Sequence, residues 1–315
     1  MSAYDWRPME PVPWPEVFDD PDWLYQVKWD GVRILSLWSA GGVRLLNRKG
    51  AERSAQYPEL ACLSSAFPAG TLLDGEIVVL NGLKPSFNLV LRRDLARRVD
   101  VIRARARQWP ALYAVFDLLY LRGQDMRSSP LEERQMALRQ IWPGNVPSLH
   151  LVESFSEGTK LFAAVGEQGL EGIVAKRRSS SYIPGKKSDA WRKVKHWRYA
   201  SCVVGGYTLR AGQPSALLLG LYDDSRLIYV GRAGSGLGNG DWQALDFFLL
   251  AAQRQESPFW QPPRLTDCEI RWVEPKLAAR VKFMEWSAAL KLRSPVVLGF
   301  QPADSEQCSF AHQGV

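Results

Sequence analysis

The sequence lacks the features that would place the chain in a membrane or on a secretory route. No apolar run reaches the ~20 residues that span a bilayer, and the strongest run, residues 112–121, is interrupted by Asp117. The amino terminus has no basic segment followed by an apolar one, as a secretory signal would have. We therefore expect a cytoplasmic protein with no membrane partner.

Cysteine and histidine are also scarce, with four and three residues respectively. The cysteines are widely scattered and include no C-x-x-C pair, which predicts reduced thiols instead of a disulfide framework or a zinc site. The histidines have no metal-ligand spacing, so chemistry based on histidine is not expected.

Positive charge, by contrast, is in excess. The net charge is +7 and the pI is about 9.3, which favours a polyanionic partner such as nucleic acid. A chain of 315 residues is too long for one small core and predicts two domains. The pattern of strands changes near residues 196–200, so we place the domains at 1–197 and 198–315.

A β-hairpin is predicted near the amino terminus. Residues 32–38 and 43–47 read as strands on either side of Ala40-Gly41-Gly42, and glycine supplies the positive φ that such turns need. A two-residue turn at positions 40 and 41 pairs position 33 with position 48. The hairpin therefore brings Arg48 beside Arg33 and the loop that contains Lys28.

Two helices are predicted in the first domain. Residues 89–107 have apolar residues at helical spacing (Leu91, Leu95, Val99, Ile102) and arginines around the remainder (Arg92, Arg93, Arg97, Arg98, Arg103, Arg105, Arg107). This helix is either a solvated surface helix or one that contacts phosphates. The second helix is expected at residues 130–140, with Ser129 as a candidate cap.

The second domain reads as a small β-barrel. Residues 201–209, 216–222 and 226–230 alternate like barrel strands, a helix is expected at 241–253, and strands follow at 269–273 and 279–286. Five short strands and one helix predict an OB-fold, a common nucleic-acid platform. The predicted fold class is α+β: mainly antiparallel sheets followed by an OB-fold β-barrel.

Six short motifs follow one another along the first domain. They are K-W-D-G-V-R at Lys28–Arg33, N-R-K-G at Asn47–Gly50, L-D-G-E at Leu73–Glu76, F-D-L-L at Phe116–Leu119, E-G-I-V-A-K at Glu171–Lys176 and W-R-K-V-K at Trp191–Lys195. Period-two alternation places Trp191, Lys193 and Lys195 on one face of a strand. Two inward lysines suit a phosphate pocket better than an apolar core; the alternative is an edge strand facing water.

Glu76 and Glu171 each begin an apolar strand. Taken alone, such residues are solvated strand ends, whereas beside a phosphate site they become candidate ligands for a divalent cation. A glycine cluster at residues 231–240 follows a strand and precedes a helix, but it has no βαβ pattern around it. We interpret that cluster as a connector in which Arg232 contacts a DNA backbone.

The ordered set of motifs resembles the covalent nucleotidyltransferases: DNA ligases, RNA ligases and mRNA capping enzymes. W-R-K-V-K, with Y-V-G-R-A-G-S-G, R-W-V-E-P-K-L and L-R-S-P-V-V-L-G-F in the carboxyl half, is similar to the ligase domain of bacterial ATP-dependent DNA ligases that work with Ku in end joining. The resemblance covers residues 22–300. It implies a nucleotidyltransferase (adenylation) domain, then an OB-fold domain.

The resemblance also implies roles for individual residues. Lys28 would be the nucleophile that forms a lysine–AMP bond, and Lys193 and Lys195 would contact the α-phosphate. Further nucleotide contacts would come from Gln26, Arg33, Arg48, Glu76, Phe116, Lys176 and Arg293, with Phe116 stacked on the adenine. Glu76 and Glu171 would bind Mg²⁺ or Mn²⁺.

Three positions depart from the family pattern. Gln26 stands where glutamate is usual, and Asn47 replaces serine or threonine. The aspartate-basic ending after Phe300 is absent, which leaves Lys291 and Arg293 as the cations able to orient pyrophosphate and predicts slow self-adenylation.

We therefore expect an ATP-dependent DNA ligase that seals 5′-phosphate/3′-hydroxyl breaks at the bacterial nucleoid during end joining. The expected partners are nicked or broken duplex DNA and a Ku-like end-binding protein, and the expected state is a monomer. The alternatives are an RNA ligase or capping-type enzyme, and a non-catalytic nucleic-acid-binding relative. NAD is a less favoured donor, since NAD-dependent relatives have an extra amino-terminal domain.

Overall fold

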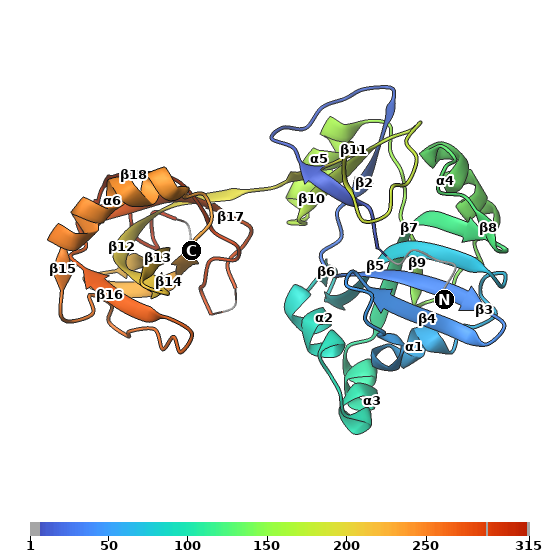
Figure 1. The fold of residues 1–315 in the computed structure, drawn as a ribbon, viewed down its shortest axis with the longest axis horizontal. Helices are drawn as coiled ribbons and strands as arrows, with labels where there is room; N and C mark the ends of the chain where they lie inside the picture. The colour runs from blue at the N-terminus through green and yellow to red at the C-terminus, as the bar shows by residue number, and fades with distance from the viewer. Residues whose placement is uncertain (1–6, 288, 314–315) are drawn as a thin grey trace. The chain divides into compact units, whose positions relative to one another are not determined.

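The computed structural model describes residues 7–287 and 289–313. The chain divides into two compact units, Met1–His196 and Trp197–Val315 (Figure 1). Each unit has its own hydrophobic core.

The first unit contains two β-sheets. The larger sheet has the strand order β4-β3-β5-β7-β8, with β6 paired to β5 and β9 paired to β7. Its strands are β3 (Val32–Ser39), β4 (Gly42–Asn47), β5 (Thr71–Asn81), β6 (Lys84–Pro85), β7 (Ala111–Leu121), β8 (Gln124–Asp125) and β9 (Leu149–Leu151). The smaller sheet has the order β1-β11-β10-β2, formed by β1 (Glu10–Pro13), β2 (Trp23–Val27), β10 (Gly172–Arg177) and β11 (Lys187–Lys195).

Apolar layers hold these sheets together. One face of the larger sheet packs against helices, which contribute Leu60, Val90 and Leu138 to a common core. A second cluster joins residues of the larger sheet, such as Leu35 and Leu119, to Trp191 of the smaller sheet. The helices of this unit are η1 (Ser54–Gln56), α1 (Pro58–Ala61), α2 (Phe87–Asp94), α3 (Val99–Gln108), α4 (Leu131–Gln140) and α5 (Gly158–Glu167).

The hairpin of β3 and β4 has the pairing predicted from a two-residue turn. Ile34 pairs with Asn47 and Ser39 with Gly42, which is the register that aligns position 33 with position 48. Gly42 has a φ of +116°, a conformation that residues with a β-carbon rarely adopt. The hairpin prediction is therefore confirmed.

The single helix predicted at residues 89–107 is wrong, because two helices, α2 and α3, occupy this stretch. Arg93 turns inward, where its guanidinium donates hydrogen bonds to Glu59 and to the carbonyl oxygens of Gln56 and Trp109. Leu95 is the C-cap of α2 and Val99 begins α3, so they do not form one apolar helix face, and they are 63% and 62% exposed. The helix predicted at 130–140 is α4, but Pro130 is its N-cap and no side chain caps it, so the cap at Ser129 is also wrong.

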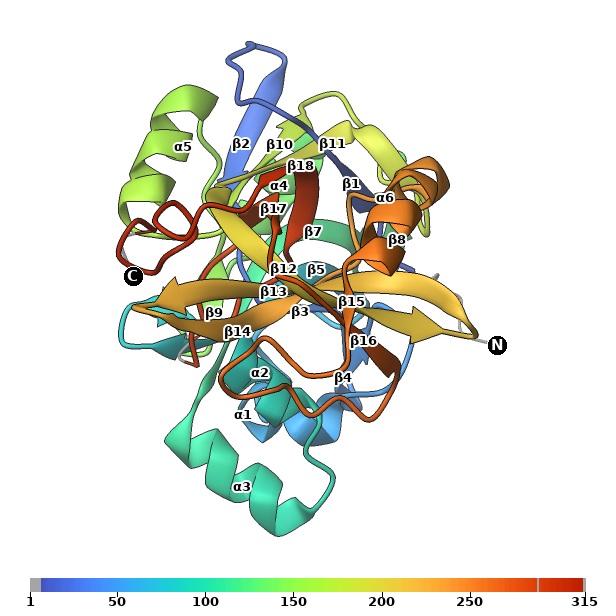
Figure 2. The ribbon, with the colours of Figure 1, turned by 90° about the vertical axis from the view of Figure 1, so that its left-hand side faces the viewer.

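The second unit is a closed barrel (Figure 2). Its elements are β12 (Arg198–Arg210), β13 (Gln213–Asp223), β14 (Arg226–Ala233), α6 (Asn239–Ala251), β15 (Gln253–Arg254), β16 (Glu269–Val273), β17 (Leu277–Phe283) and β18 (Val296–Pro302). The long β12 pairs with β13, β16 and β17, and β17 pairs with β18. A parallel bridge between Ser235, just after β14, and Val296 closes the circuit.

This barrel has the topology expected of an OB-fold, and the α+β class is confirmed. The last strand, β18, was not predicted, and β17 ends at Phe283 instead of continuing to Trp286. Within the described part of the chain, no helix is both long enough and apolar enough to cross a membrane.

Candidate active site

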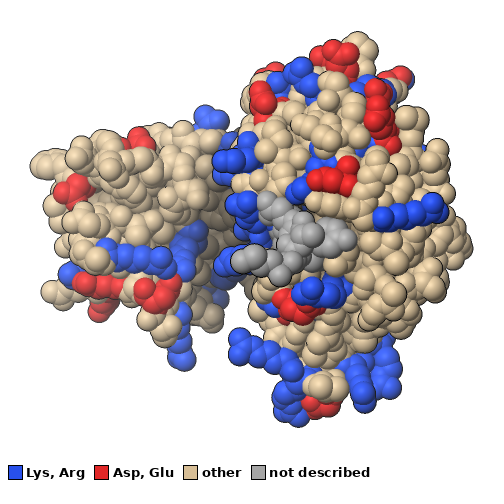
Figure 3. All heavy atoms as spheres, turned by 45° about the vertical axis from the view of Figure 1, so that its right-hand side comes forward, with Lys and Arg blue, Asp and Glu red and all other residues tan. Residues whose placement is uncertain are grey.

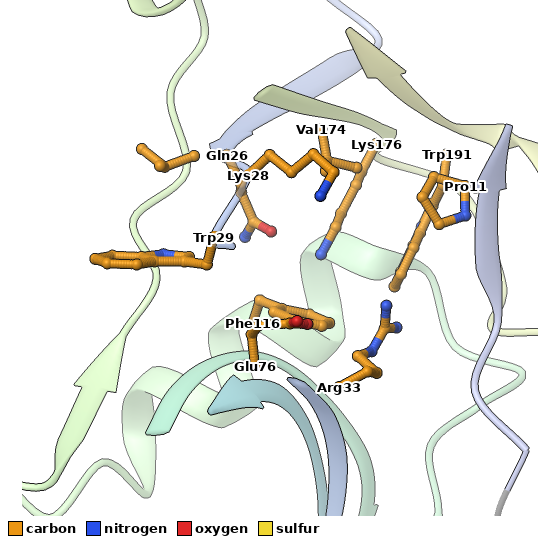
Figure 4. A pocket seen from close by; sticks show the side chains of 11 residues that line it. Pro11, Gln26, Lys28, Trp29, Arg33, Glu76, Phe116, Val174, Lys176 and Trp191 are labelled. Carbon is orange, nitrogen blue, oxygen red and sulfur yellow. The ribbon is translucent and has the colours of Figure 1, made fainter. Parts of the chain in front are cut away.

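A cavity of the first unit brings together residues from the two sheets (Figure 4). It is lined by Pro11, Gln26, Val27, Lys28, Trp29, Arg33, Glu76, Phe116, Val174, Lys176 and Trp191. Six of these residues, Gln26, Lys28, Arg33, Glu76, Phe116 and Lys176, are ones that the sequence analysis selected. Five of them lie in four of the six motifs and Gln26 lies two residues before the first motif, so elements far apart in the sequence converge on one space.

Lys28 is held at the end of β2 by its own backbone. Its N–H donates to the carbonyl oxygen of Gly172, 2.9 Å away. Three residues later, a β-carbon at Gly31 would overlap the carbonyl oxygen of Ile77. Glycine is therefore required in this loop for the close passage of the chain beside β5.

Glu171 links two lysines of the site. Its carboxylate accepts a hydrogen bond from Lys28 Nζ at 2.5 Å and forms an ion pair with Lys195 Nζ at 2.7 Å. Burial alone would raise the pKa of Glu171, but attraction to Lys28 and Lys195 outweighs burial and holds that pKa below its ordinary value. The carboxylate therefore stays charged and fixes the direction of both ammonium groups.

The register of β10 and β11 decides which side chains face the site. Lys176 pairs with Trp191 and Val174 with Lys193, and paired residues of an antiparallel ladder point to the same face. Trp191, Lys193 and Lys195 therefore share a face with Val174 and Lys176. Partial burial, followed by repulsion from Lys195 and Lys28, lowers the pKa of Lys193.

Lys176 is a buried cation without a conventional partner. Its ammonium lies 4.2 Å from the ring centre of Phe116 and 4.1 Å from that of Trp191. No described residue accepts a hydrogen bond from Nζ, and burial lowers the pKa of Lys176 to about 7. A ligand that offered an acceptor here would satisfy this nitrogen.

Glu76 faces the same space from β5, directly beside Arg33 in the strand register. Burial raises the pKa of Glu76 to about 7, although Lys28 and Arg33 act in the opposite direction. The two glutamates therefore differ: Glu171 is a firmly ionised partner of lysines, whereas Glu76 titrates close to neutral pH.

Gln26 is buried and tied into a chain of hydrogen bonds. Its amide donates to Ser154 Oγ at 2.9 Å, while the amide of Gln135 donates to the carbonyl oxygen of Phe116 at 2.6 Å. Ser154 Oγ and Gln135 Oε1 are 3.5 Å apart. The residue that replaces the usual glutamate is thus connected to the backbone of Phe116.

Some predicted nucleotide-binding residues do not line the cavity. Arg48 is exposed and forms a 3.5 Å ion pair with Glu10. Lys193 and Lys195 share the inward face but stand outside the lining. Arg293 belongs to the second unit, where it pairs with Glu285.

The two predicted metal ligands, Glu76 and Glu171, differ in how well they suit a cation. In the described ranges, no three or more Asp, Glu, His or Cys side chains form a metal-binding group. Both carboxylate oxygens of Glu171 face ammonium groups, so a cation there would compete with Lys28 and Lys195. Glu76 fits a divalent cation better, because a carboxylate with a raised pKa gains from a nearby positive charge.

Comparison with known proteins agrees with this arrangement. Residues 15–195 match the family described as ATP dependent DNA ligase domain, and residues 210–304 match the ATP dependent DNA ligase C terminal region. The chain belongs to the ATP-dependent DNA ligase family. The predicted resemblance is thereby confirmed.

Individual relatives place this ligase more narrowly. The chain is 34% identical over 288 residues to the multifunctional non-homologous end joining protein LigD of Mycobacterium bovis, covering 89% of this chain and 36% of that protein. LigD of Pseudomonas aeruginosa is 31% identical, with 89% and 34% covered. The chain thus spans about a third of the length of these relatives.

A solved structure of mycobacterial DNA ligase D complexed with ATP and MES is also similar to this ligase. It has a TM-score of 0.56 and 32% identity, and the match covers 95% of this chain and 96% of that chain. The ligase is therefore related to the LigD ligase domain over nearly its whole length.

Several residues that shape the site are not among those predicted from the sequence. Pro11, Trp29 and Val174 line the cavity without having been selected. Asp74, which does not line the cavity, accepts hydrogen bonds from Arg33 and from the Tyr182 hydroxyl. Asp74 lies two residues before Glu76 in the L-D-G-E motif, which was the available signal; Tyr182 had none.

Proposed function

We propose that this ligase seals 5′-phosphate/3′-hydroxyl breaks in duplex DNA through a covalent lysine–AMP intermediate on Lys28. The Lys28 amine attacks the α-phosphate of ATP, a P–N bond forms, the bond to the β-phosphate oxygen breaks and pyrophosphate leaves. AMP then passes to the 5′ phosphate of the break and is released when the 3′ hydroxyl attacks. The observation that supports this best is the position of the Lys28 amine, held at a cavity by Glu171.

The remaining cavity residues suit the nucleotide in the same way. Phe116 offers a ring for the adenine, and the unpartnered ammonium of Lys176 needs an acceptor. Arg33 and Glu76 lie beside each other for the ribose and phosphates. Lys193 and Lys195, on the inward face of β11, would meet the α-phosphate as its charge increases.

A divalent cation would act together with the ATP phosphates. We infer that Mg²⁺ or Mn²⁺ is held mainly by phosphate oxygens with Glu76 as the protein carboxylate. Such an ion neutralises phosphate charge during the displacement. Arg48 and Arg293 would reach the nucleotide by moving, since each has an acidic partner in this structure.

We place the reaction in DNA end joining with a Ku-like partner, because the LigD relatives are end-joining proteins by name. Basic side chains at α3 would contact DNA phosphates, and the barrel of the second unit provides a further nucleic-acid platform. An end-binding partner would raise the local concentration of the ligase at breaks without adding chemistry.

The test is incubation with α-labelled ATP, GTP or NAD followed by denaturing electrophoresis. We expect a covalent label from ATP in the wild-type protein and in Lys160→Ala, a control lysine on α5 that is exposed. Lys28→Ala should lose the label yet still seal a nick already adenylated at its 5′ phosphate. Wild-type labelling of Lys28→Ala would overturn the assignment, and labelling from GTP would favour a capping-type enzyme.

A further inference from the structure

A short segment before the first motif forms one wall of the cavity. This amino-terminal strap, residues 7–14, includes β1, which pairs in parallel with β11 at the edge of the smaller sheet. Pro11 of the strap lines the cavity, and Figure 4 shows it close to Trp191 and to the end of the Arg33 side chain.

The strap pairs with β11 along the whole of β1, from Glu10 to Pro13, and forms further backbone hydrogen bonds there. Glu10 N donates to the carbonyl oxygen of Lys186, and Trp14 N donates to that of Lys193. Pro11 and Pro13 have no N–H to donate, which is tolerated because β1 is an edge strand, and the register shifts between Pro11 and Val12. The side chain of Met9 is fully buried and anchors the start of the strap.

The backbone of Met9 closes a ring of hydrogen bonds around Arg33. Met9 N–H donates to the Tyr182 hydroxyl at 2.9 Å, and that hydroxyl donates to Asp74 Oδ2 at 2.6 Å. Asp74 in turn accepts from Arg33 Nε at 2.5 Å and from Nη2 at 2.6 Å. Arg33 Nη2 completes the ring by donating to the carbonyl oxygen of Met9 at 3.2 Å.

This ring engages two of the three guanidinium nitrogens and leaves the third, Nη1, outside it. Asp74 accepts from both Nε and Nη2 and the Met9 carbonyl oxygen accepts from Nη2, whereas none of the described residues accepts a hydrogen bond from Nη1. Burial and the charge of Asp74 raise the pKa of Tyr182 well above its ordinary value, so the hydroxyl stays protonated and continues to donate. The Arg33 side chain is thus held by the Asp74 carboxylate and the Met9 carbonyl oxygen, and the second of these belongs to the strap.

We propose that Tyr182 and the amino-terminal strap position Arg33 for the nucleotide, so that the strap is a working part of the adenylation site. This inference rests on the proposed lysine–AMP chemistry. Tyr182 is a positioning residue: it lies behind Arg33 and acts on the nucleotide only through it. When the Tyr182 hydroxyl is lost, Asp74 and the Met9 N–H lose a shared partner. The Arg33 side chain can then move away from its position at the cavity.

The test is self-adenylation of Tyr182→Phe over a range of ATP concentrations. The matched control is Tyr120→Phe, which removes a hydroxyl from the same core cluster but one that bonds Asp125, away from the cavity. We expect Tyr182→Phe to raise the KM for ATP about tenfold, equivalent to ~1.4 kcal/mol. The control should keep the wild-type KM, and sealing of a pre-adenylated nick should change much less than labelling does in either variant.

Thermal melts separate positioning from a loss of folding. A Tyr182→Phe protein that is folded at the assay temperature and labels with the wild-type KM would overturn the inference. If this variant melts below the assay temperature, Asp74→Asn provides the same test, because it weakens the grip on Arg33 while keeping the shape of the side chain. A failure of the underlying chemistry is distinguishable, since the wild-type protein would then take up no label from ATP.

Discussion

Lys28 Nζ lies 2.5 Å from Glu171 Oε2, and the other oxygen of that carboxylate is 2.7 Å from Lys195 Nζ. One buried carboxylate thus holds the proposed nucleophile and a proposed phosphate ligand, although these residues belong to three different motifs. Each of the two ammonium groups stabilises the charge of Glu171, and Glu171 keeps the two like charges together.

Replacing Glu171 with Gln should slow lysine–AMP formation by at least about tenfold, because a charge-assisted hydrogen bond contributes ~1.5–3 kcal/mol. Glu167→Gln, an exposed change on α5, is the control for labelling with α-labelled ATP. The pKa of Glu171 is lowered in the folded protein, so its charged form stabilises the fold at pH values above the ordinary pKa of a carboxylate. This contribution is lost as the pH falls through the lowered pKa. The melting difference between wild type and Glu171→Gln should therefore shrink below about pH 4; a constant difference would contradict the ion-pair account.

Glu76 should give the opposite pH dependence. Its pKa is raised to about 7 in the folded protein, so the folded state favours the protonated form, and this favourable term is lost as pH rises through 7. Glu76→Gln cannot ionise, so its melting temperature relative to wild type should increase between pH 5 and pH 8. Parallel melts of the two proteins at several pH values measure this. A difference in melting temperature that narrows toward pH 8 would show that burial does not disfavour the charged form of Glu76.

Phe116→Ala should raise the ATP concentration needed for labelling more than it disturbs folding. Loss of base stacking costs ~1–3 kcal/mol, and the change also removes one of the two rings beside Lys176. Phe162→Ala, a partly buried ring stacked on His196, is the control. If Phe116→Ala has a much lower melting temperature but an unchanged ATP affinity per folded molecule, Phe116 acts in core packing and not in adenine binding.

Sealing should depend more steeply on salt than self-adenylation does, since DNA is held through phosphates. Figure 3 shows Lys and Arg gathered at the end of the first unit where α3 lies, and Arg97 and Arg98 are exposed there. Charge reversal of both residues should weaken nick binding and flatten the slope of log affinity against log salt, with lysine–AMP formation near wild type. Reversal of Lys160 and Arg139, which are exposed on α5 and α4, controls for net charge; an equal effect of both pairs would leave α3 without a specific role.

A cognate Ku-like protein should stimulate joining of linear duplexes at low ligase concentration. The physical reason is effective molarity at the break, and the readout is the yield of joined ends with and without that partner. Sealing of an internal nick, where no end is available, serves as the control. Efficient unaided nick sealing together with no stimulation of end joining would point to a general nick-sealing role.

Much of this ligase follows from the sequence by itself. Alternation with a period of two placed Trp191, Lys193 and Lys195 on one face, and turn chemistry set the hairpin that aligns Arg33 with position 48. These features depend on near neighbours along the chain, where strand periodicity and glycine conformation decide the outcome. The order of motifs likewise led to the family and to six of the residues that line the cavity.

Tertiary structure alone decided how the charges are paired. Arg93, predicted on a basic surface, is buried against Glu59, while Arg48 pairs with Glu10 instead of lining the cavity. Arg33 is held by Asp74 and the backbone of Met9, and Asp74 is held in turn by Tyr182, although these groups lie far apart in the sequence. The sequence offers each charged side chain many oppositely charged partners. The fold selects the one that lies beside it, because burial of an unpaired charge costs free energy.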